Sequence, residues 1–442
     1  MSDLFIIGAS GTKAYRTAMA AISENITNAS TEGYARRTVT TAESGASTST
    51  MALYVSRANF GGTEVTGVAR ASDPYLDATV RMTATAMGSA SARMRWLTDT
   101  ETALNDGDTG IGKLITGMFG HIDKLAASPN DTSLRVTTLD SISRVAESFR
   151  QTSAELAEVS AGIGTEAQSA VDRTNATLVA LGNINNSLLR AQPGTSAHAQ
   201  LLDSRDSALL TLSATLNVDI SFGANDSVQV NFNGTTLVQG SAASSLTLAA
   251  NADGTLTLAS GATALAAPAS GQLGGLFATA QVVADRRESL DTLAAQFVTD
   301  INAWHAQGRT DANVAGGALL SGTTAATMAA LVTSPADFAT RSADGTLNGN
   351  LLTTSTLRGN GSVEQGWTAL IATHANLLGA TGQEFSTARE RADQAVAARE
   401  AVSGVDLDME AADLLRIQQA YSGCAKILQI ARETVDAILK II

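Results

Sequence analysis

The residues of this chain that could carry chemistry are few and lie far apart. The histidines come first, because an imidazole can act as a base or bind a metal ion. None has a second metal-ligating residue at helical spacing, so the sequence predicts no metal site and no histidine-based catalytic centre. The four histidines are His121, His198, His305 and His374.

Three further patterns indicate structure rather than catalysis. Asp203 and Asp206 could form an acid pair, but the segment Asp-Ser-Arg-Asp at 203–206 is more typical of an ion-paired helix surface. The glycine-rich segment 271–275 lacks both the Lys-Ser/Thr of a phosphate-binding loop and the Rossmann glycine spacing, so it predicts a turn between domains. No serine stands in a Gly-x-Ser-x-Gly elbow with an evident base. The sequence therefore predicts no enzyme activity and no cofactor.

Composition narrows the class of protein. The 442 residues include 29 basic and 42 acidic ones, for a net charge of −13, which argues against binding to nucleic acid or to anionic lipid. Hydrophobic residues make up 44% of the chain but aromatic residues only 4%, so its cores should be helix–helix seams of Ala, Leu and Val. Only 5 prolines interrupt the chain, and this suits long helices.

Cys424 is the only cysteine, so no intramolecular disulfide can form. That fits a reducing compartment, and it also fits a protein exported unfolded through a narrow channel. Cys424 is expected to be a small buried hydrophobe rather than a reactive thiol. No segment approaches the roughly 20 apolar residues that span a bilayer. The N-terminal residues have no basic region, so no Sec-type signal peptide is expected.

The two ends of the chain carry the strongest pattern. Toward the C-terminus, apolar or small residues recur at alternating spacings of three and four, which is the heptad seam of a helix that packs along another helix. The residues of this seam are Leu414, Ile417, Tyr421, Cys424, Leu428, Ala431, Val435, Ile438 and Ile442. A seam of this length needs a partner. The other terminus and neighbouring copies of the chain are the two candidates.

The N-terminal residues carry a weaker version of the same pattern, at Leu4, Ile7, Gly11, Ala14 and Ala18, with Tyr15, Ile22 and Ile26 beside it. From the pattern alone, an internal coiled coil within a soluble helical protein is the favoured interpretation. If the seam packs copies together, we expect these residues to carry it: Leu4, Ile7, Ala18, Ile22, Leu414, Ile417, Tyr421, Leu428, Val435 and Ile438.

Most of the chain reads as helix. Pro74 after Asp73 is typical of a helix start, and Asp406 or Asp408 could cap the last helix. Residues 29–75, with an alternating piece at 52–55, and residues 307–365 read as extended or irregular chain, apart from a short helix near 323–331. Helices are predicted over 3–28, 74–105, 111–126, 132–191, 197–215, 272–306, 366–402 and 408–440.

Between the helices, residues 216–271 alternate polar and apolar with period two. Asn233-Gly234 and Asp253-Gly254 predict hairpin turns within this segment. The fold class is therefore mainly α with a small β insertion: an elongated, interleaved helical bundle with a coiled-coil-like terminal domain. The predicted domains are a terminal helical polymerisation domain (1–40 with 404–442), a helical rod or bundle (41–215 with 272–403) and an inserted outer β domain (216–271).

Several motifs resemble one family. Asn25, Asn28, Gly33 and Tyr34 match the Asn-Ile-x-Asn-x-x-x-x-Gly-Tyr signature that follows the first helix of bacterial flagellar rod, hook and hook-associated proteins. The segments 403–410, 418–421 and 425–426 resemble the terminal helix of the same family. Within it, the segments 201–206, 233–240, 271–276 and 301–308 resemble the hook-associated protein 1 (FlgK type) family. Relative to its larger members the β insertion is short, so one outer domain is expected.

This resemblance implies a structural part of the bacterial flagellum that forms the first ring of the hook–filament junction. It implies export by the flagellar type III system, secretion without a cleaved signal peptide, and self-assembly through terminal helices that are mobile in the free monomer. The implied partners are other copies of the chain, the hook protein, the other hook-associated protein and an export chaperone. The four signature residues are also expected to shape the turn out of the first helix.

Two kinds of alternative stay open. The chain could be another flagellar axial component: a hook protein, a distal-rod protein or the second junction protein. A helical scaffold module with ordered termini is the alternative from another class. An enzyme carried by the β insertion is disfavoured, because residues 216–271 contain no His, Cys, Lys, Arg or Glu.

Overall fold

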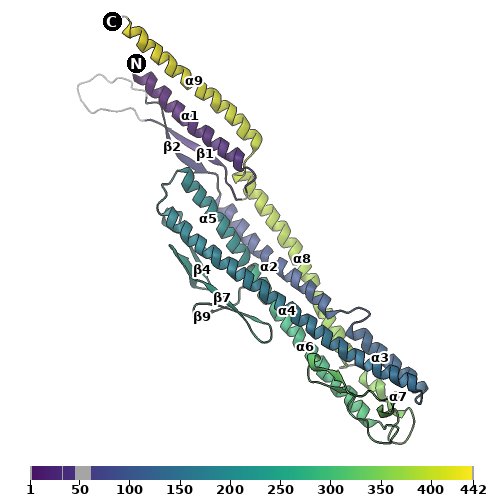
Figure 1. Ribbon diagram of the computed structural model, residues 1–442. Coiled ribbons are helices and arrows are strands. Elements are labelled where there is room, and N and C mark those ends of the chain that lie inside the picture. The colour runs from purple at the N-terminus through teal and green to yellow at the C-terminus, as the bar shows by residue number, and fades with distance from the viewer. Residues whose placement is uncertain (1, 32, 45–60, 441–442) are drawn as a thin grey trace. The chain divides into compact units, whose positions relative to one another are not determined.

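The computed structural model describes residues 2–31, 33–44 and 61–440 (Figure 1). Within these residues the chain forms two compact units, each built from separate stretches of sequence. The terminal unit comprises Met1–Thr85, Thr174–Ser245 and Arg389–Ile442, and the central unit comprises Ala86–Arg173 and Leu246–Ala388. The long helices are α1 (Ser2–Asn28), α2 (Pro74–Leu104), α3 (Ile111–Ala127), α4 (Thr132–Leu188), α5 (Ser196–Thr215), α6 (Gly271–Gln307), α8 (Val363–Ser403) and α9 (Leu407–Leu439).

Helix ends lie where the local sequence predicts them. At the start of α2, Asp73 Oδ1 accepts hydrogen bonds from the backbone N–H groups of Tyr75 (2.8 Å) and Leu76 (3.3 Å). Asp406 caps α9 in the same way, accepting from the N–H groups of Asp408 (2.9 Å) and Met409 (3.1 Å). Each carboxylate satisfies backbone donors that the first turn of a helix leaves free, which fixes where the helix begins.

The terminal unit contains two small antiparallel sheets beside its helices. Strands β1 (Arg37–Glu43) and β2 (Thr63–Arg70) pair with each other. A second sheet has the order β3-β4-β5-β6, formed by Asp219–Phe222, Val228–Phe232, Thr235–Gln239 and Ala242–Ala243. Asn233 and Gly234 join β4 to β5 with φ of 48° and 80°, the left-handed pair of a two-residue hairpin turn. This confirms the hairpin predicted at that position.

The central unit is organised around one large apolar core. Phe149 of α4 and Phe297 of α6 stack there with ring centroids 5.9 Å apart, and both are buried. Trp367 of α8 is also buried, and its Nε1–H donates to Asp106 Oδ1 at 3.1 Å. Leu, Ile, Val and Ala form much of the rest, but the core also contains Phe119, Trp304 and Phe338, so it holds more aromatic side chains than the composition predicts.

Smaller elements complete the central unit. A three-stranded sheet of β7 (Leu246–Ala250), β8 (Leu256–Ser260) and β9 (Thr263–Leu265) includes the hairpin predicted at Asp253-Gly254. The helix predicted near 323–331 reduces to one 3-10 turn, η2 (Ala325–Thr327), between the short strands β10 (Leu320–Ser321) and β11 (Ala329–Ala330). Short turns follow, namely η3 (Pro335–Asp337), α7 (Gly349–Leu352) and η4 (Thr353–Leu357), and η1 (Ala224–Asp226) lies in the terminal unit.

These observations confirm a mainly α fold with small sheets. The strands predicted as one insertion at 216–271 form two separate sheets, β3–β6 in the terminal unit and β7–β9 in the central unit. The three-part domain division stays a prediction, and the alternating piece at 52–55 lies outside the described residues. Among the residues described, no helix combines the length and apolar character that a bilayer crossing requires.

Candidate functional site

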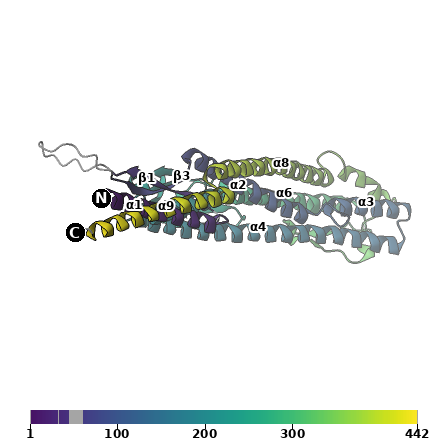
Figure 2. The same cartoon turned by 90° about the horizontal axis from the view of Figure 1, so that it is seen from above.

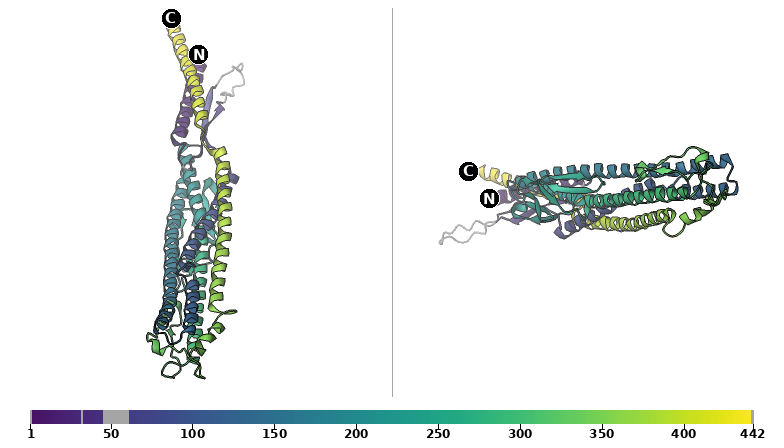
Figure 3. Two further views of the ribbon diagram at one scale, coloured as in Figure 1. Left: turned by 90° about the vertical axis from the view of Figure 1, so that its right-hand side faces the viewer. Right: turned by 90° about the horizontal axis from the view of Figure 1, so that it is seen from below.

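The first and last helices of the described chain lie side by side in the terminal unit (Figures 1 and 2). A Cβ atom placed on Gly8 would stand 2.8 Å from Leu428 Cγ, and one on Gly11 would stand 2.6 Å from Cys424 Sγ. Residue numbers rise along α1 as they fall along α9, so the two helices are antiparallel. The same pairing is visible in Figure 3.

Small residues on α1 allow this close approach. Gly8, Gly11, Ala14 and Ala21 are buried along one face of the helix. Opposite them, α9 supplies larger side chains, among them Leu428. Larger residues at the two glycines would overlap α9, so the weak N-terminal pattern is a groove rather than a ridge. The two ends of the chain are therefore complementary in shape.

The ten residues predicted to pack copies of the chain differ in how much this single copy covers them. Ile22 is buried, at 9% exposed. Leu4 (44%) and Ile438 (40%) are exposed. The seven between these limits are half-buried: Ile7, Ala18, Leu414, Ile417, Tyr421, Leu428 and Val435. Ile442, the last residue of the predicted seam, lies outside the described residues.

The family signature forms a buried polar cluster at the end of α1. Asn25 is fully buried, and its amide reaches two neighbouring elements. Its Nδ2 donates to the backbone oxygen of Arg37 (2.9 Å) and to Glu410 Oε2 (3.1 Å), while its Oδ1 accepts from the Arg37 N–H (2.9 Å). One side chain thus joins α1 to the start of β1 and to the first turn of α9.

The other three signature residues shape the chain between α1 and β1. Tyr34 Oη donates to Asn25 Oδ1 at 2.8 Å. Asn28 Nδ2 donates to the Glu24 backbone oxygen at 3.0 Å, and its own backbone oxygen accepts from the Thr31 N–H at 2.9 Å. Gly33 has a φ of +78°, a left-handed conformation that favours glycine. The signature therefore does form the turn out of the first helix, and it adds the cluster around Asn25.

Arg36 ties α9 to the same cluster. Its Nε lies 2.6 Å from Glu410 Oε1, and its backbone N–H donates to the Ser403 oxygen at 2.9 Å. Glu410 is only 1% exposed, so this carboxylate depends on Arg36 and Asn25 to replace its hydration. Sequence reasoning missed Glu410 as a functional residue. Two signals pointed to it: it lies in the segment 403–410 that resembles the family, and it falls seven residues before Ile417, at a seam position where an apolar residue is expected.

A second network of charges links β1 and β2 to α5. The Arg37 side chain is 3% exposed, and its guanidinium contacts Glu24, Ser196 Oγ (3.0 Å) and Asp203 Oδ2 (3.1 Å). Asp203 also binds Arg70, with Oδ1 2.5 Å from the Arg70 Nε. Because Asp203 is shared by two buried guanidinium groups, it couples β1, β2 and α5.

The same network continues along α5. Arg70 Nη1 lies 2.7 Å from Asp206 Oδ2, and Arg205 Nη2 lies 2.8 Å from Asp206 Oδ1. Burial raises the pKa of the Asp203 carboxyl above its usual range, although Arg70 and Arg37 act in the opposite direction. Burial opposes the charge on Arg70, yet Asp206 and Asp203 raise the pKa of its guanidinium overall. The segment 203–206 is thus ion-paired, as predicted, but within the unit rather than at a solvated surface.

Tyr34 supplies a spectroscopic test of the cluster. Burial raises the pKa of its phenol to about 12. Because the folded state binds this proton more tightly than the unfolded state does, the protonated phenol adds to the free energy of unfolding. This contribution is complete below pH ~10, the pKa of an unfolded tyrosine, and is lost as pH rises toward 12. Absorbance at 295 nm should therefore show a phenolate step near pH 12 that Tyr34→Phe removes. Tyr75→Phe, at a 75% exposed position, should leave that step in place. If Tyr34→Phe leaves the step unchanged, Tyr34 is not held in the buried cluster.

Three of the histidines are buried. His198 lies in the terminal unit, with its Nε2 3.5 Å from Asp226 Oδ2, and the other two have structural partners in the central unit. His305 Nε2 accepts from the Ala339 N–H at 2.8 Å, and Nδ1 lies 2.6 Å from the Gly317 oxygen. His374 Nε2 lies 2.9 Å from the Leu97 oxygen. Burial lowers the pKa of both imidazoles, which keeps them neutral. Within the described part of the chain, no three His, Cys, Asp or Glu side chains are grouped to hold a metal ion.

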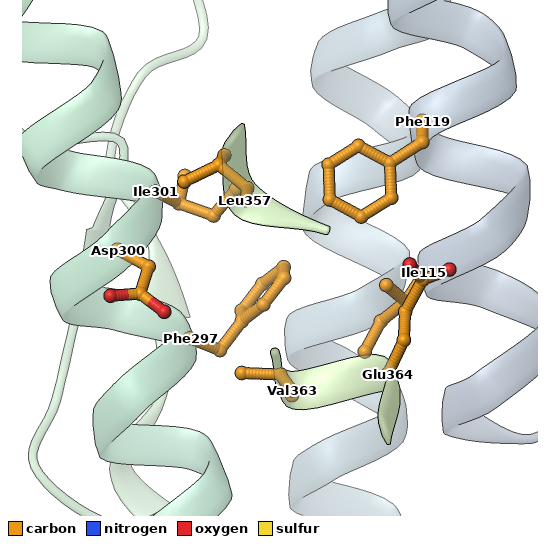
Figure 4. Close-up of a pocket in the computed structure, with 8 residues that line it drawn as sticks. All are labelled: Ile115, Phe119, Phe297, Asp300, Ile301, Leu357, Val363 and Glu364. Atoms are coloured by element: carbon orange, nitrogen blue, oxygen red, sulfur yellow. The ribbon is translucent and has the colours of Figure 1, made fainter. Parts of the chain in front are cut away.

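A small cleft in the central unit is drawn in Figure 4. The space inside it, including the solvent at its mouth, is about 240 Å³. Glu364 at its edge is engaged, accepting hydrogen bonds from Arg358 Nε (2.8 Å) and Thr116 Oγ1 (3.0 Å). The lining residues are Ile115, Phe119, Phe297, Asp300, Ile301, Leu357, Val363 and Glu364. Apart from the carboxylates of Asp300 and Glu364, all of these side chains are apolar.

Comparison with known proteins decides the family. The family model of the helical domain of flagellar hook-associated protein FlgK matches residues 97–320, about half of the chain. The chain belongs to the FlgK family of flagellar hook-associated proteins. This confirms the resemblance seen in the sequence. The flagellar hook-associated protein 1 of Bacillus subtilis (strain 168) is 24% identical over 485 residues, covering 96% of this chain and 95% of the relative.

A solved FlgK structure supports the fold. It is the flagellar hook junction protein FlgK from Burkholderia pseudomallei, to which this FlgK-family chain is 23% identical with a TM-score of 0.50. The match covers 55% of this chain and 46% of that chain, so the present chain spans less than half of the solved one. At this identity the likeness shows the shared fold alone.

Proposed function

We propose that this chain is a structural protein of the bacterial flagellum, and that it forms the first junction ring between hook and filament. Membership of the FlgK family supports this proposal. The names of its relatives agree, since one is a flagellar hook-associated protein and another a flagellar hook junction protein. On this proposal the chain acts by assembly and not as an enzyme.

The observation that carries the proposal is the poor burial of α9. Among its 33 residues only Glu410 and Ala431 are buried. Several large apolar side chains of the helix are exposed in the single copy, namely Leu407 (52%), Met409 (56%), Leu415 (62%), Ile430 (50%), Ile438 (40%) and Leu439 (67%). Exposed apolar surface of this extent on one helix favours a further protein partner.

The same argument extends to α1. Its first turns expose Leu4 (44%), Phe5 (37%) and Ile6 (49%), and the antiparallel pairing brings them to the same end as the last turns of α9. Half-buried residues of the seam serve the pairing within one copy. The exposed residues remain available to a second copy. Burying one Leu or Ile side chain at such a contact contributes about 1.5–3 kcal/mol, repeated in every subunit.

The remaining parts of the proposal follow from the family. Self-assembly into a ring brings copies of this chain together, with the hook protein on one side and the other hook-associated protein on the other. Export by the flagellar type III system, with the help of a chaperone, places the protein outside the cell. Residues 1–40 with 404–442 serve as the polymerisation domain, the helical bundle as the body and the strands at 216–271 as the outer part.

An exposed leucine of α9 tests this proposal. Leu415→Gln should abolish or strongly reduce swimming in soft agar, because it places a polar amide in the subunit contact. It should change the free energy of unfolding of the purified chain by less than about 0.5 kcal/mol, since the side chain is exposed.

Leu352→Gln is the matched control, because Leu352 is equally exposed at 62% but lies in α7. We expect this variant to swim like the parent. Normal swimming by the Leu415→Gln strain, with normal filament number, would remove this face of α9 from the subunit contact.

A further inference from the structure

The α1–α9 pair has one polar layer in an otherwise apolar or small-residue seam. Asn25 continues the seven-residue series of α1 that includes Leu4, Gly11 and Ala18. Glu410 begins the corresponding series of α9, which continues with Ile417, Cys424, Ala431 and Ile438. Both polar residues therefore stand at core positions of their heptads, and they are hydrogen-bonded to each other at 3.1 Å.

Two contacts between the helices define a single register. Asn25 pairs with Glu410, and Gly11 lies against Cys424, fourteen residues away on both helices. This equal spacing means that the helices stay in step over four turns. The same register places Ala18 opposite Ile417 and Leu4 opposite Ala431.

The apolar part of the seam constrains this register only where Gly8 and Gly11 approach α9 closely. A slip of one heptad in either direction still sets mostly apolar or small residues against each other, because both series repeat every seven residues, although Leu4 or Ala18 would then replace Gly11 against Cys424. A slip would, in contrast, separate the two residues of the polar layer. A slip one way would set the Glu410 carboxylate against Ala18, and a slip the other way would set Asn25 against Ile417. Either slip leaves a buried polar group without its partner, which is strongly unfavourable.

We propose that the Asn25–Glu410–Arg36 cluster is a register lock that selects one alignment of the terminal helices. A buried polar residue in a coiled-coil seam has this effect, at some cost in stability. Arg36 supports the lock, because its ion pair compensates the buried charge of Glu410. The register determines which exposed residues of the first turns of α1 lie beside which exposed residues of the last turns of α9. Its importance for subunit packing rests on the proposed function.

The competing source of register is the short connection between α8 and α9, residues 404–406. A six-residue Gly-Ser insertion after Gly404 relaxes this tether, so that only the seam and the polar layer hold the alignment. Two chains are then compared, one with Glu410 and one with Glu410→Leu. Leucine extends the apolar seam through the polar position.

Disulfide trapping reads the register, because Cys424 is the only native cysteine. A Cβ atom on Gly11 would stand 3.6 Å from Cys424 Cβ, within the ~3.5–4.5 Å range of disulfides. Gly11→Cys therefore reports the native register. Leu4→Cys and Ala18→Cys report the two heptad slips. Each reporter is placed separately in both tethered backgrounds and oxidised in the purified monomer.

With Glu410 present, we expect the Gly11→Cys disulfide to exceed either slipped disulfide by about tenfold or more, as a specific buried polar contact requires. With Glu410→Leu, we expect the slipped disulfides to rise to within about threefold of the native one. Native disulfide alone in the Glu410→Leu chain would overturn the proposal, and so would slipped disulfides with Glu410 intact. The assay uses a single purified chain, so its outcome does not depend on whether the protein assembles in a flagellum.

Discussion

Asp203→Ala should lower the free energy of unfolding of the terminal unit by about 3 kcal/mol. The carboxylate is shared by the guanidinium groups of Arg37 and Arg70, whose side chains are only 3% and 10% exposed. Removing it leaves buried positive charge without its shared partner. The expected loss lies at the lower end of the ~3–5 kcal/mol range for a broken buried pair, because Arg37 keeps Glu24 and Arg70 keeps Asp206.

Two optical probes separate the units in this measurement. All three tryptophans, Trp96, Trp304 and Trp367, lie in the central unit, so their fluorescence follows that unit. Far-ultraviolet circular dichroism follows the helices of both. In urea, Asp203→Ala should lower the midpoint of the circular dichroism transition more than that of the tryptophan transition.

Asp393→Ala is the control for this experiment. Its ion pair with Arg389 also lies in the terminal unit, but the two side chains are 75% and 67% exposed. An exposed pair contributes less than about 1 kcal/mol, so the urea transitions should not move measurably. Equal effects of the two alanine substitutions would show that the charge network around Asp203 is not buried as described.

Phe149→Ala should destabilise the central unit by about 3–5 kcal/mol. Phe149 is fully buried and stacks on Phe297, so its removal forfeits the burial of a ring and leaves a cavity between α4 and α6. Here the tryptophan transition should shift to lower urea concentration. Phe149→Leu should cost less, because it refills most of the volume.

An exposed apolar residue of the same helix gives the control. Val136 is 51% exposed, and Val136→Ala should change the free energy of unfolding by less than about 0.5 kcal/mol. A loss of under about 1 kcal/mol for Phe149→Ala would contradict the single core assigned to the central unit.

Local sequence signals predicted the helices and turns well, because their causes are local. Asp73 and Asp406 cap helices with hydrogen bonds to residues two and three positions away. The Asn233-Gly234 turn depends on two residues that tolerate positive φ. Each of these features lies within a few residues of the segment that it shapes.

Features that depend on distant pairing were not predicted. Alternation identified the strands at 216–271, but it carries no information on which strands pair, and they form two sheets. The burial of Glu410 depends on Asn25 and Arg36, which lie at the other end of the sequence. A single sequence places such a carboxylate by default on a solvated surface. The role of Asn25 as a link between three elements was missed for the same reason.

The ten predicted packing residues were also predicted only in part. The heptad seam correctly placed α9 against α1, since Leu428 and Cys424 lie over Gly8 and Gly11. The pattern did not distinguish residues used within one copy from those left exposed. Only the burial of each side chain in the structure makes that distinction. The exposed apolar residues of α9 are the ones that support the proposed assembly.

The measurement that tests the central claim most directly is electron microscopy of a strain from which this gene is deleted. The account predicts hooks without filaments and loss of swimming. The intact chain should restore both, and a chain without residues 407–442 should restore neither. Normal filaments on the deletion strain would contradict the assignment of this protein to the hook–filament junction.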